Sequence, residues 1–169
     1  MKQFKTLLFA SLLFVGATSF STAQTKIAHI NTTQLVEAMP EMKTAQAEIE
    51  RLTKTYEAEI KTMATELQNK VKQYQAEVDT KTDEENASRG QEVQTMEQSI
   101  RQYQGQAQQD LQKKEADLLK PIFEKAKAAI DKVSKAQGFH YVLDSTQGGG
   151  VLVADGKDLL ADVKTELGF

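Results

Sequence analysis

Residues 148–158 (GGGVLVADGKD) carry the residue types that a nucleotide-binding loop needs. Glycines let the backbone approach a phosphate, and a Gly-Lys pair can place an ammonium group on it. The spacing does not fit, because the Walker pattern puts four residues before the Gly-Lys pair and requires Ser or Thr after it. Five residues separate Gly150 from Gly156, and Asp158 follows Lys157. We therefore expect a β-hairpin here, with a glycine-rich turn before a strand at 151–153, and no bound cofactor.

The two histidines, His29 and His140, both fall in expected strands, so they could approach one another as metal ligands. Zinc usually takes at least three protein ligands, and no carboxylate or thiol is spaced to complete the set. We therefore expect ordinary packed or half-exposed histidines and no metal site. The acidic residues alternate with lysines, as on a solvated helix, and no serine has a plausible triad. The sequence predicts a protein that is not an enzyme and has no catalytic residues.

The first 23 residues have the order of a secretory signal peptide. Lys2 and Lys5 precede an apolar run at 7–15, and small residues at 21–23 suit a signal peptidase. The apolar run is too short to cross a bilayer, which needs about 20 residues. We predict export, with cleavage before Gln24. The chain has no cysteine, which excludes disulfides and a lipid-modified anchor.

The charge of the chain argues against nucleic acid as a partner. The formal net charge is −3, and it becomes −5 without Lys2 and Lys5. Binding to nucleic acid rests on a concentrated basic surface, which this composition does not offer. Few aromatic residues and many Glu, Gln, Lys and Ala instead favour long helices over a large globular core.

Apolar residues recur every three or four positions in two long stripes, which is typical of amphipathic helices. The polar residues 79–91 (DTKTDEENASRGQ) separate the stripes. Each stripe can bury only against the other, so we predict an antiparallel helical hairpin at 41–120 with its tip near 79–91. This pairing should consume the stripes and leave no broad apolar surface. The stripe positions are Met42, Ala45, Ile49, Leu52, Tyr56, Ile60, Met63, Leu67, Val71, Tyr74 and Val78, then Val93, Met96, Ile100, Tyr103, Ala107, Leu111, Leu118 and Ile122.

Both ends of the chain contribute to a small base, at 24–40 and 121–169, so the fold class is mainly α with a small β base (α+β). Pro121 is expected to interrupt the returning helix. The base has 66 residues and is marginal alone, which favours self-association. Its expected elements are strands at 26–30, 139–143 and 151–153, a helix at 33–39 capped by Asn31, and a last helix capped by Asp158 that carries Leu159, Leu160, Val163 and Leu167.

Gly105 lies inside the second stripe region, where glycine costs about 1 kcal/mol relative to alanine. With the tip near Asn86, Gly105 should face Leu67 on the other helix. Two interpretations remain open. Gly105 gives steric room to Leu67, or it is a flex point of the arm.

The chain after residue 23 resembles the Skp/OmpH family of periplasmic chaperones. The resemblance is carried by KIAHINTTQLVEAMPE, LLKPIFEKAKAAIDKVSKAQGFHYVLDST and DLLADVKTELGF, with the long hairpin between the first two. It implies a periplasmic homotrimer whose bases share a β-rich core. The hairpins would extend as tentacles around a space that holds unfolded outer-membrane proteins without ATP. On this basis the base and trimer core would be Ile27, Ile30, Tyr141, Leu143, Val151 and Val153.

The charge of the arm departs from the family pattern. Residues 41–120 contain 12 Lys and Arg against 16 Asp and Glu, whereas well-known members have strongly basic tentacles. The acidic arm counts against lipopolysaccharide binding and leaves electrostatic capture to a local basic patch. Client binding should then be weak at each contact and multivalent overall. The alternative function is a structural envelope scaffold or coiled-coil adaptor that uses the arms as spacers.

Overall fold

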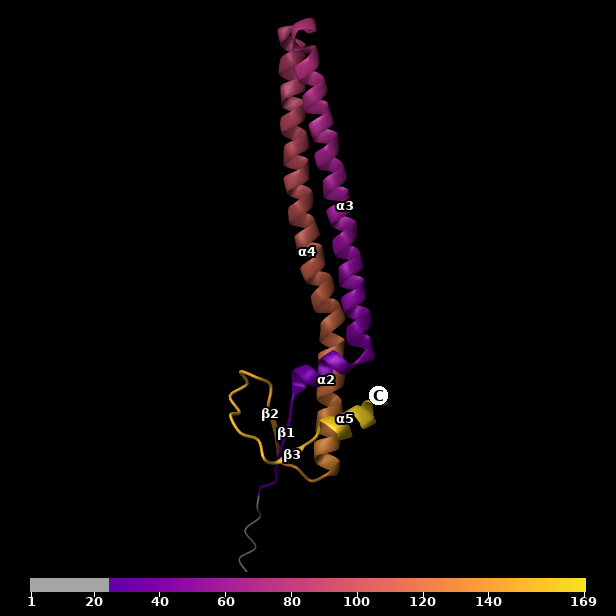
Figure 1. Ribbon diagram of the computed structural model, residues 1–169, viewed down its shortest axis with the longest axis vertical. Coiled ribbons are helices and arrows are strands. Elements are labelled where there is room, and N and C mark those ends of the chain that lie inside the picture. The colour runs from indigo at the N-terminus through magenta and orange to yellow at the C-terminus, as the bar shows by residue number, and fades with distance from the viewer. Residues whose placement is uncertain (1–24) are drawn as a thin grey trace, which may run out of the picture.

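The computed structural model describes residues 25–169, and the predicted signal peptide at 1–23 with its cleavage position lies outside the described residues. A long pair of helices stands on a small base that contains a sheet and two short helices (Figure 1). The predicted α+β class, mainly helical, is confirmed. The elements in chain order are β1 (Ile27–Ile30), α2 (Thr32–Ala38), α3 (Pro40–Glu77), η1 (Val78–Thr80), α4 (Asp83–Ala136), β2 (Tyr141–Asp144), β3 (Lys157–Asp158) and α5 (Leu160–Leu167).

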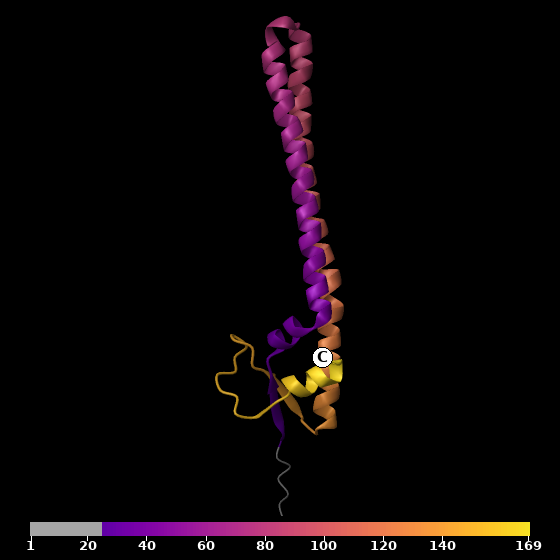
Figure 2. The ribbon, with the colours of Figure 1, turned by 45° about the vertical axis from the view of Figure 1, so that its right-hand side comes forward.

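Helices α3 and α4 lie side by side along the whole arm in both views (Figure 1, Figure 2). Every position of the two predicted stripes except Val78 is buried or half-buried, so the periodicity identified the contact face correctly. Within the arm, only Ala45 and Ala107 are fully buried. Two helices alone cannot enclose a stripe, and the larger apolar side chains therefore stay partly accessible.

The turn at the tip is shorter than the sequence predicted. The expected loop at 79–91 is wrong beyond residue 82, because α4 begins at Asp83. Thr82 forms a capping box: its Oγ1 accepts from the Glu85 backbone N–H at 3.2 Å, and its own N–H donates to Glu85 Oε2 at 3.0 Å. This reciprocal pair satisfies two free donors of the first turn, which allows a polar sequence to start a helix.

Pro121 does not interrupt the returning helix, contrary to the prediction, and α4 runs through it for 54 residues. Proline removes one N–H donor, so the carbonyl of Asp117 loses its helical partner. The turns on either side are held by packing, because Ile122 and Ala126 are buried in the base core and Leu118 packs against it. The predicted boundary between arm and base at 120/121 thus falls inside one continuous helix.

The sheet has the order β2-β1-β3, and both outer strands run parallel to β1. The predicted hairpin is therefore wrong: residues 151–153 form no strand, and Lys157–Asp158 pairs with β1 instead. Parallel neighbours cannot be joined by a tight turn, so the chain from β2 needs the long connection 145–156 to reach the other side of β1. Ile27 pairs with Tyr141 and His29 with Leu143 on the β2 side.

The core of the base lies between one face of the sheet and helices α2, α4 and α5. Its fully buried side chains include Ile30, Leu35, Met39, Leu159 and Val163. The predicted cap at Asn31 is confirmed, because its Oδ1 accepts from the Gln34 N–H at 2.8 Å. The predicted cap at Asp158 is wrong by one residue: Leu159 is the N-cap of α5, and Asp158 Oδ1 accepts from the Leu160 N–H at 2.9 Å in the turn before the helix. None of the helices within residues 25–169 is long and apolar enough to cross a membrane.

Candidate functional site

The glycine-rich stretch serves a loop of the base. Gly148 and Gly150 adopt φ of +89° and +85°, and a Cβ at Gly149 would lie 2.9 Å from the Thr146 carbonyl oxygen. These positions need glycine because of backbone conformation and crowding. Lys157 forms an ion pair with Asp162 at 2.9 Å, so its ammonium already has an anionic partner within the chain.

Asp144 fixes the start of this loop to the start of α2. Its carboxylate accepts from Thr32 Oγ1 at 2.7 Å and from the Thr146 N–H at 2.9 Å. Burial raises the pKa of Asp144, but the hydrogen bonds from Thr146 and Thr32 outweigh that effect and lower the pKa to about 2. The carboxylate therefore stabilises the fold as an anion.

The two histidines each have their own hydrogen-bond partners and are not brought together. His29 Nε2 lies 3.1 Å from the Gly156 carbonyl oxygen, and its Nδ1 lies 3.4 Å from Ser145 Oγ. His140 Nδ1 accepts from the Lys26 N–H at 3.3 Å, at the opposite end of β1. Among the described residues no group of three or more His, Cys, Asp or Glu is placed to hold a metal ion.

The outer face of the sheet exposes apolar side chains, which we call the sheet face. Because side chains alternate along a strand, Ala28 and Ile30 point into the core and their neighbours point outward. Ile30 is the one predicted base-core residue that is buried within the chain, at 1% exposure. The sheet face consists of Ile27, Tyr141 and Leu143, which are 50%, 61% and 43% exposed.

The loop beside the sheet face is also apolar. Leu152 and Val153 are 97% and 76% exposed, and Val151 is half-buried. Leu152 was not among the predicted site residues, although its place between two valines could have indicated it. Large apolar side chains as exposed as these commonly mark a protein–protein contact where they lie together. Their place in a trimer core stays a prediction.

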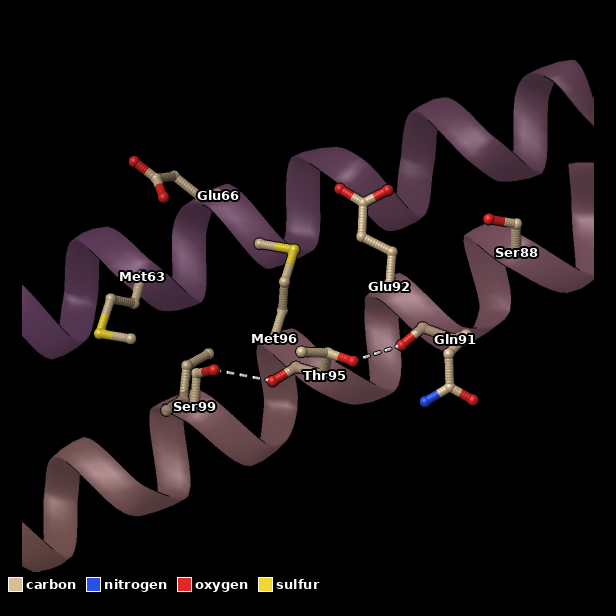
Figure 3. A pocket seen from close by; sticks show the side chains of 9 residues that line it. Met63, Glu66, Ser88, Gln91, Glu92, Thr95, Met96 and Ser99 are labelled. Atoms are coloured by element: carbon tan, nitrogen blue, oxygen red, sulfur yellow. Dashed lines mark hydrogen bonds between the residues drawn. The ribbon is translucent and has the colours of Figure 1, made fainter.

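The arm keeps an open apolar groove near its tip, which corrects the expectation that helix pairing consumes the stripes. Met63 of α3 and Met96 and Ile100 of α4 line a cleft of about 540 Å³ between the helices (Figure 3). Met96 and Glu92 point toward α3, whereas Gln91 points away from it. Methionine side chains adapt to differently shaped apolar groups, so this groove suits variable ligands.

The lining of this groove on α4 includes the short hydroxyl side chains of Thr95 and Ser99, beside Gln91 and Glu92. Thr95 Oγ1 donates to the Gln91 carbonyl at 2.8 Å, and Ser99 Oγ donates to the Thr95 carbonyl at 2.9 Å. These hydroxyls are satisfied by their own helix, as the dashed lines in Figure 3 show. The Thr95 and Ser99 hydroxyls are therefore not free donors, and the groove combines an apolar floor with the carboxylates of Glu66 and Glu92.

A second groove lies at the root of the arm, where α3 and α4 meet the base. It has a volume of about 820 Å³, and its apolar floor includes Ala45, Leu118 and Ile122. Lys125 and Glu41 form an ion pair across it. The hydrogen bond from Lys125 is the largest cause that lowers the pKa of Glu41.

Gly105 has open space around it. A Cβ built there meets no atom within 4 Å, so the interpretation that Gly105 makes room for Leu67 is wrong. Leu67 is not opposite, because the shorter turn moves the register and places Tyr103 against Tyr56 and Glu59. The role of Gly105 as a flex point stays a prediction.

Comparison with known proteins identifies a family and solved structures of similar fold. The family model described as outer membrane protein (OmpH-like) matches residues 26–167. A solved structure from Caulobacter crescentus CB15, provisionally described as an OmpH-like outer membrane chaperone, is similar with a TM-score of 0.74 and 18% sequence identity. The match covers 83% of this chain and 82% of that one, and at this identity it concerns the fold. The curated proteins give no match.

Proposed function

Because the chain belongs to the OmpH-like family of outer membrane proteins, we propose that it is an ATP-independent holdase chaperone of the periplasm. It binds unfolded outer-membrane proteins and keeps their apolar segments apart, which prevents edge-to-edge aggregation. The chaperone description of the similar Caulobacter protein supports this class of function. The predicted signal peptide supports export to the periplasm.

The observation that carries the proposal is the open apolar groove of the arm at Met63, Met96 and Ile100. A helical spacer needs no accessible apolar floor, whereas a holdase needs many weak apolar contacts that fit different clients. Each contact is small, and avidity over several arms makes the total sufficient. Clients would be released by transfer to a partner that binds them more strongly.

The sheet face supports a homotrimer in which three bases join and three arms enclose a cavity. Ile27, Tyr141 and Leu143 expose apolar area that a partner would bury. The two base segments form a small domain that gains stability from such burial. On this proposal the same face that is exposed in one chain becomes part of the trimer core.

The function is tested by diluting a urea-unfolded outer-membrane barrel protein into buffer, with and without this protein. We expect excess protein to suppress the rise in light scattering without added ATP. Unchanged scattering would contradict the holdase proposal and favour a structural envelope scaffold or coiled-coil adaptor. Native mass spectrometry tests the homotrimer separately, and a monomer would contradict it.

A further inference from the structure

The groove at Met63, Met96 and Ile100, which we call the tip groove, has carboxylates beside its apolar floor. Glu66 of α3 and Glu92 of α4 line it together with these apolar side chains. Figure 3 shows the two glutamates on either side of Met96, one on each helix. Glu66 is exposed, and the three apolar side chains are half-buried, so a segment of another chain can reach both kinds of group. The tip groove therefore joins an apolar surface to negative charge.

The net negative charge of the arm lies in the half that holds the tip groove. Residues 63–100 contain 4 Lys and Arg against 8 Asp and Glu, whereas the rest of the arm, at 41–62 and 101–120, contains 8 of each kind. The tip half thus carries a net charge of −4, and the root half carries none. A cationic segment that approaches the arm is therefore attracted to the tip half.

The cations around the tip groove are paired with carboxylates of their own or lie on the far side of α3. The pairs are Lys70 with Glu92, Arg89 with Glu77, Lys81 with Glu85 and Arg101 with Glu97. Lys61 and Lys72 are two and nine residues from Met63, which places both about half a turn round α3 from it. These cations therefore leave the other carboxylates around the groove uncompensated.

Glu66 and Glu84 are the carboxylates that keep their charge near the tip groove. Both are exposed, and neither is in an ion pair with another of the residues 25–169. Lys70 and Lys81 stand one turn from Glu66 and Glu84, but the ammonium group of each already binds another glutamate. Glu84 lies one turn before Ser88, which lines the groove. The two free carboxylates thus stand on different helices beside the same apolar floor.

We propose that the tip groove binds unfolded client segments in which an aromatic or branched apolar side chain lies beside Lys or Arg. The apolar side chain packs on Met63 and Met96, whose flexible thioethers adapt to its shape, while the cation meets Glu66. Such charge contacts at an exposed surface give selectivity and weaken with salt. The inference rests on the proposed holdase function, to which it adds a preference among client segments.

The test uses the full protein and two fluorescein-labelled peptides of one sequence, with aromatic residues beside Lys in one and beside Gln in the other. Binding is measured by fluorescence anisotropy at low and high salt. We expect the Lys peptide to bind about threefold to tenfold more tightly at low salt, as two exposed charge contacts allow. High salt should remove this difference. Glu66→Gln with Glu84→Gln should remove most of it, while Met96→Gln should weaken the binding of both peptides.

Matched controls separate the tip groove from general charge and apolarity. Glu57 and Glu115 are likewise exposed and in no ion pair with the described residues, so Glu57→Gln with Glu115→Gln removes the same charge from the root half of the arm. Phe123→Ser removes an apolar side chain that is 52% exposed near the base. We expect both controls to keep the preference for the Lys peptide. Equal losses in control and tip-groove variants would overturn the proposal.

Three further results would also overturn it. Wild-type protein that binds both peptides equally has no preference for cationic segments. Unchanged binding of both peptides to Met96→Gln would place the apolar contact outside the groove. A change of native mass in Glu66→Gln with Glu84→Gln would place the groove between copies of the chain. The light-scattering assay keeps the two proposals distinguishable, because wild-type protein that suppresses aggregation without peptide preference loses only the cationic preference of the tip groove.

Discussion

The guanidinium of Arg89 lies over the ring of Tyr74, with its central carbon 4.6 Å from the ring centroid, and so joins α4 to α3 near the tip. Arg89 Nη2 also donates to Glu77 Oε2 at 2.5 Å, and the Tyr74 hydroxyl donates to Glu92. The Arg89 side chain is 17% exposed, so these contacts are screened less than the other ion pairs of the arm. Together they fix the register of the two helices just inside the turn.

Replacement of Arg89 by alanine should loosen the tip. We expect a loss of about 1–2 kcal/mol in the free energy of unfolding, because a partly desolvated cation–π contact and an ion pair disappear together. Denaturant unfolding measures the loss, and amide exchange should increase around Tyr74 and Glu92. Arg101→Ala is the control, since Arg101 forms only a surface pair with Glu97 at 3.7 Å. Equal losses in the two variants would contradict the special role of Arg89.

Gly105→Ala should stabilise the protein. The added Cβ meets no neighbour, and alanine favours a helix interior by about 1 kcal/mol, which corresponds to a rise of about 2–4 °C in Tm. Calorimetry measures the rise. Spin labels at the tips test the flex point separately, because alanine should then narrow the distribution of tip-to-tip distances. A higher Tm with an unchanged distribution of tip-to-tip distances would contradict the flex point. Gly105 would then be a residue of low helix propensity and nothing more.

Thr82→Ala should fray the first turn of α4. The variant removes the capping box with Glu85, and such a cap contributes about 1 kcal/mol. Amide exchange at residues 83–86 should rise while exchange near Ala107 stays unchanged. Thr95→Ala is a matched control, because the Thr95 hydroxyl bonds a carbonyl within the helix and caps no helix end.

Acid should weaken the attachment of the base loop to α2. The pKa of Asp144 is held at about 2 in the folded chain, below the value of about 4 for a free aspartate. Its stabilisation is therefore fully present above about pH 4 and is lost as the pH falls toward 2. Asp144 is exposed to solvent, so we expect a contribution of only about 1 kcal/mol. Asp144→Asn should flatten the dependence of the unfolding free energy on pH in this window. Thr32→Val removes the hydroxyl donor of Thr32 and should weaken the same pH dependence in part.

The sheet face should be needed for assembly and not for the fold of one chain. Tyr141→Ser with Leu143→Ser removes apolar area that the single chain leaves exposed, so circular dichroism should change little. Native mass spectrometry should show a shift from trimer to monomer. Ile30→Ala, which opens the buried core, should instead lower the stability by about 2–5 kcal/mol. A trimer that survives the Tyr141 and Leu143 changes would contradict the proposed interface.

The arm was well predicted because its helices are determined by apolar periodicity within short stretches of sequence. A stripe from Met42 to Tyr74 and its counterpart from Val93 to Ile122 define two helix faces that have only one another to contact. The short helix after Asn31 was also predictable from its capping residue, and the last helix from its apolar spacing, although its N-cap is Leu159 and not Asp158. The capping box at Thr82 and Glu85 was readable in the same way, but the polar composition around it indicated a loop.

The base was less predictable because its pairing is not local. The valines at 151 and 153 have strand-forming side chains, yet Lys157 and Asp158 occupy the position beside β1. Nothing in the spacing of these residues distinguishes a parallel crossover from a hairpin. The groove at Met63 and Met96 escaped prediction for another reason, since periodicity identifies a contact face without telling how completely two helices cover it.

Because α4 continues through Pro121, the two helices of the arm are connected to the base in different ways. α4 enters the base without a break, whereas α3 begins at Pro40, directly after the separate helix α2. About 38 residues of helix from Asp83 to Lys120 span about 57 Å, so a bend of about 5° at Pro121 moves the tip by about 5 Å. The base core holds both helices at their roots, since Met39 between α2 and α3 is fully buried in the same cluster as Ile122 of α4. A small change of angle at the root is therefore amplified along the length of the arm.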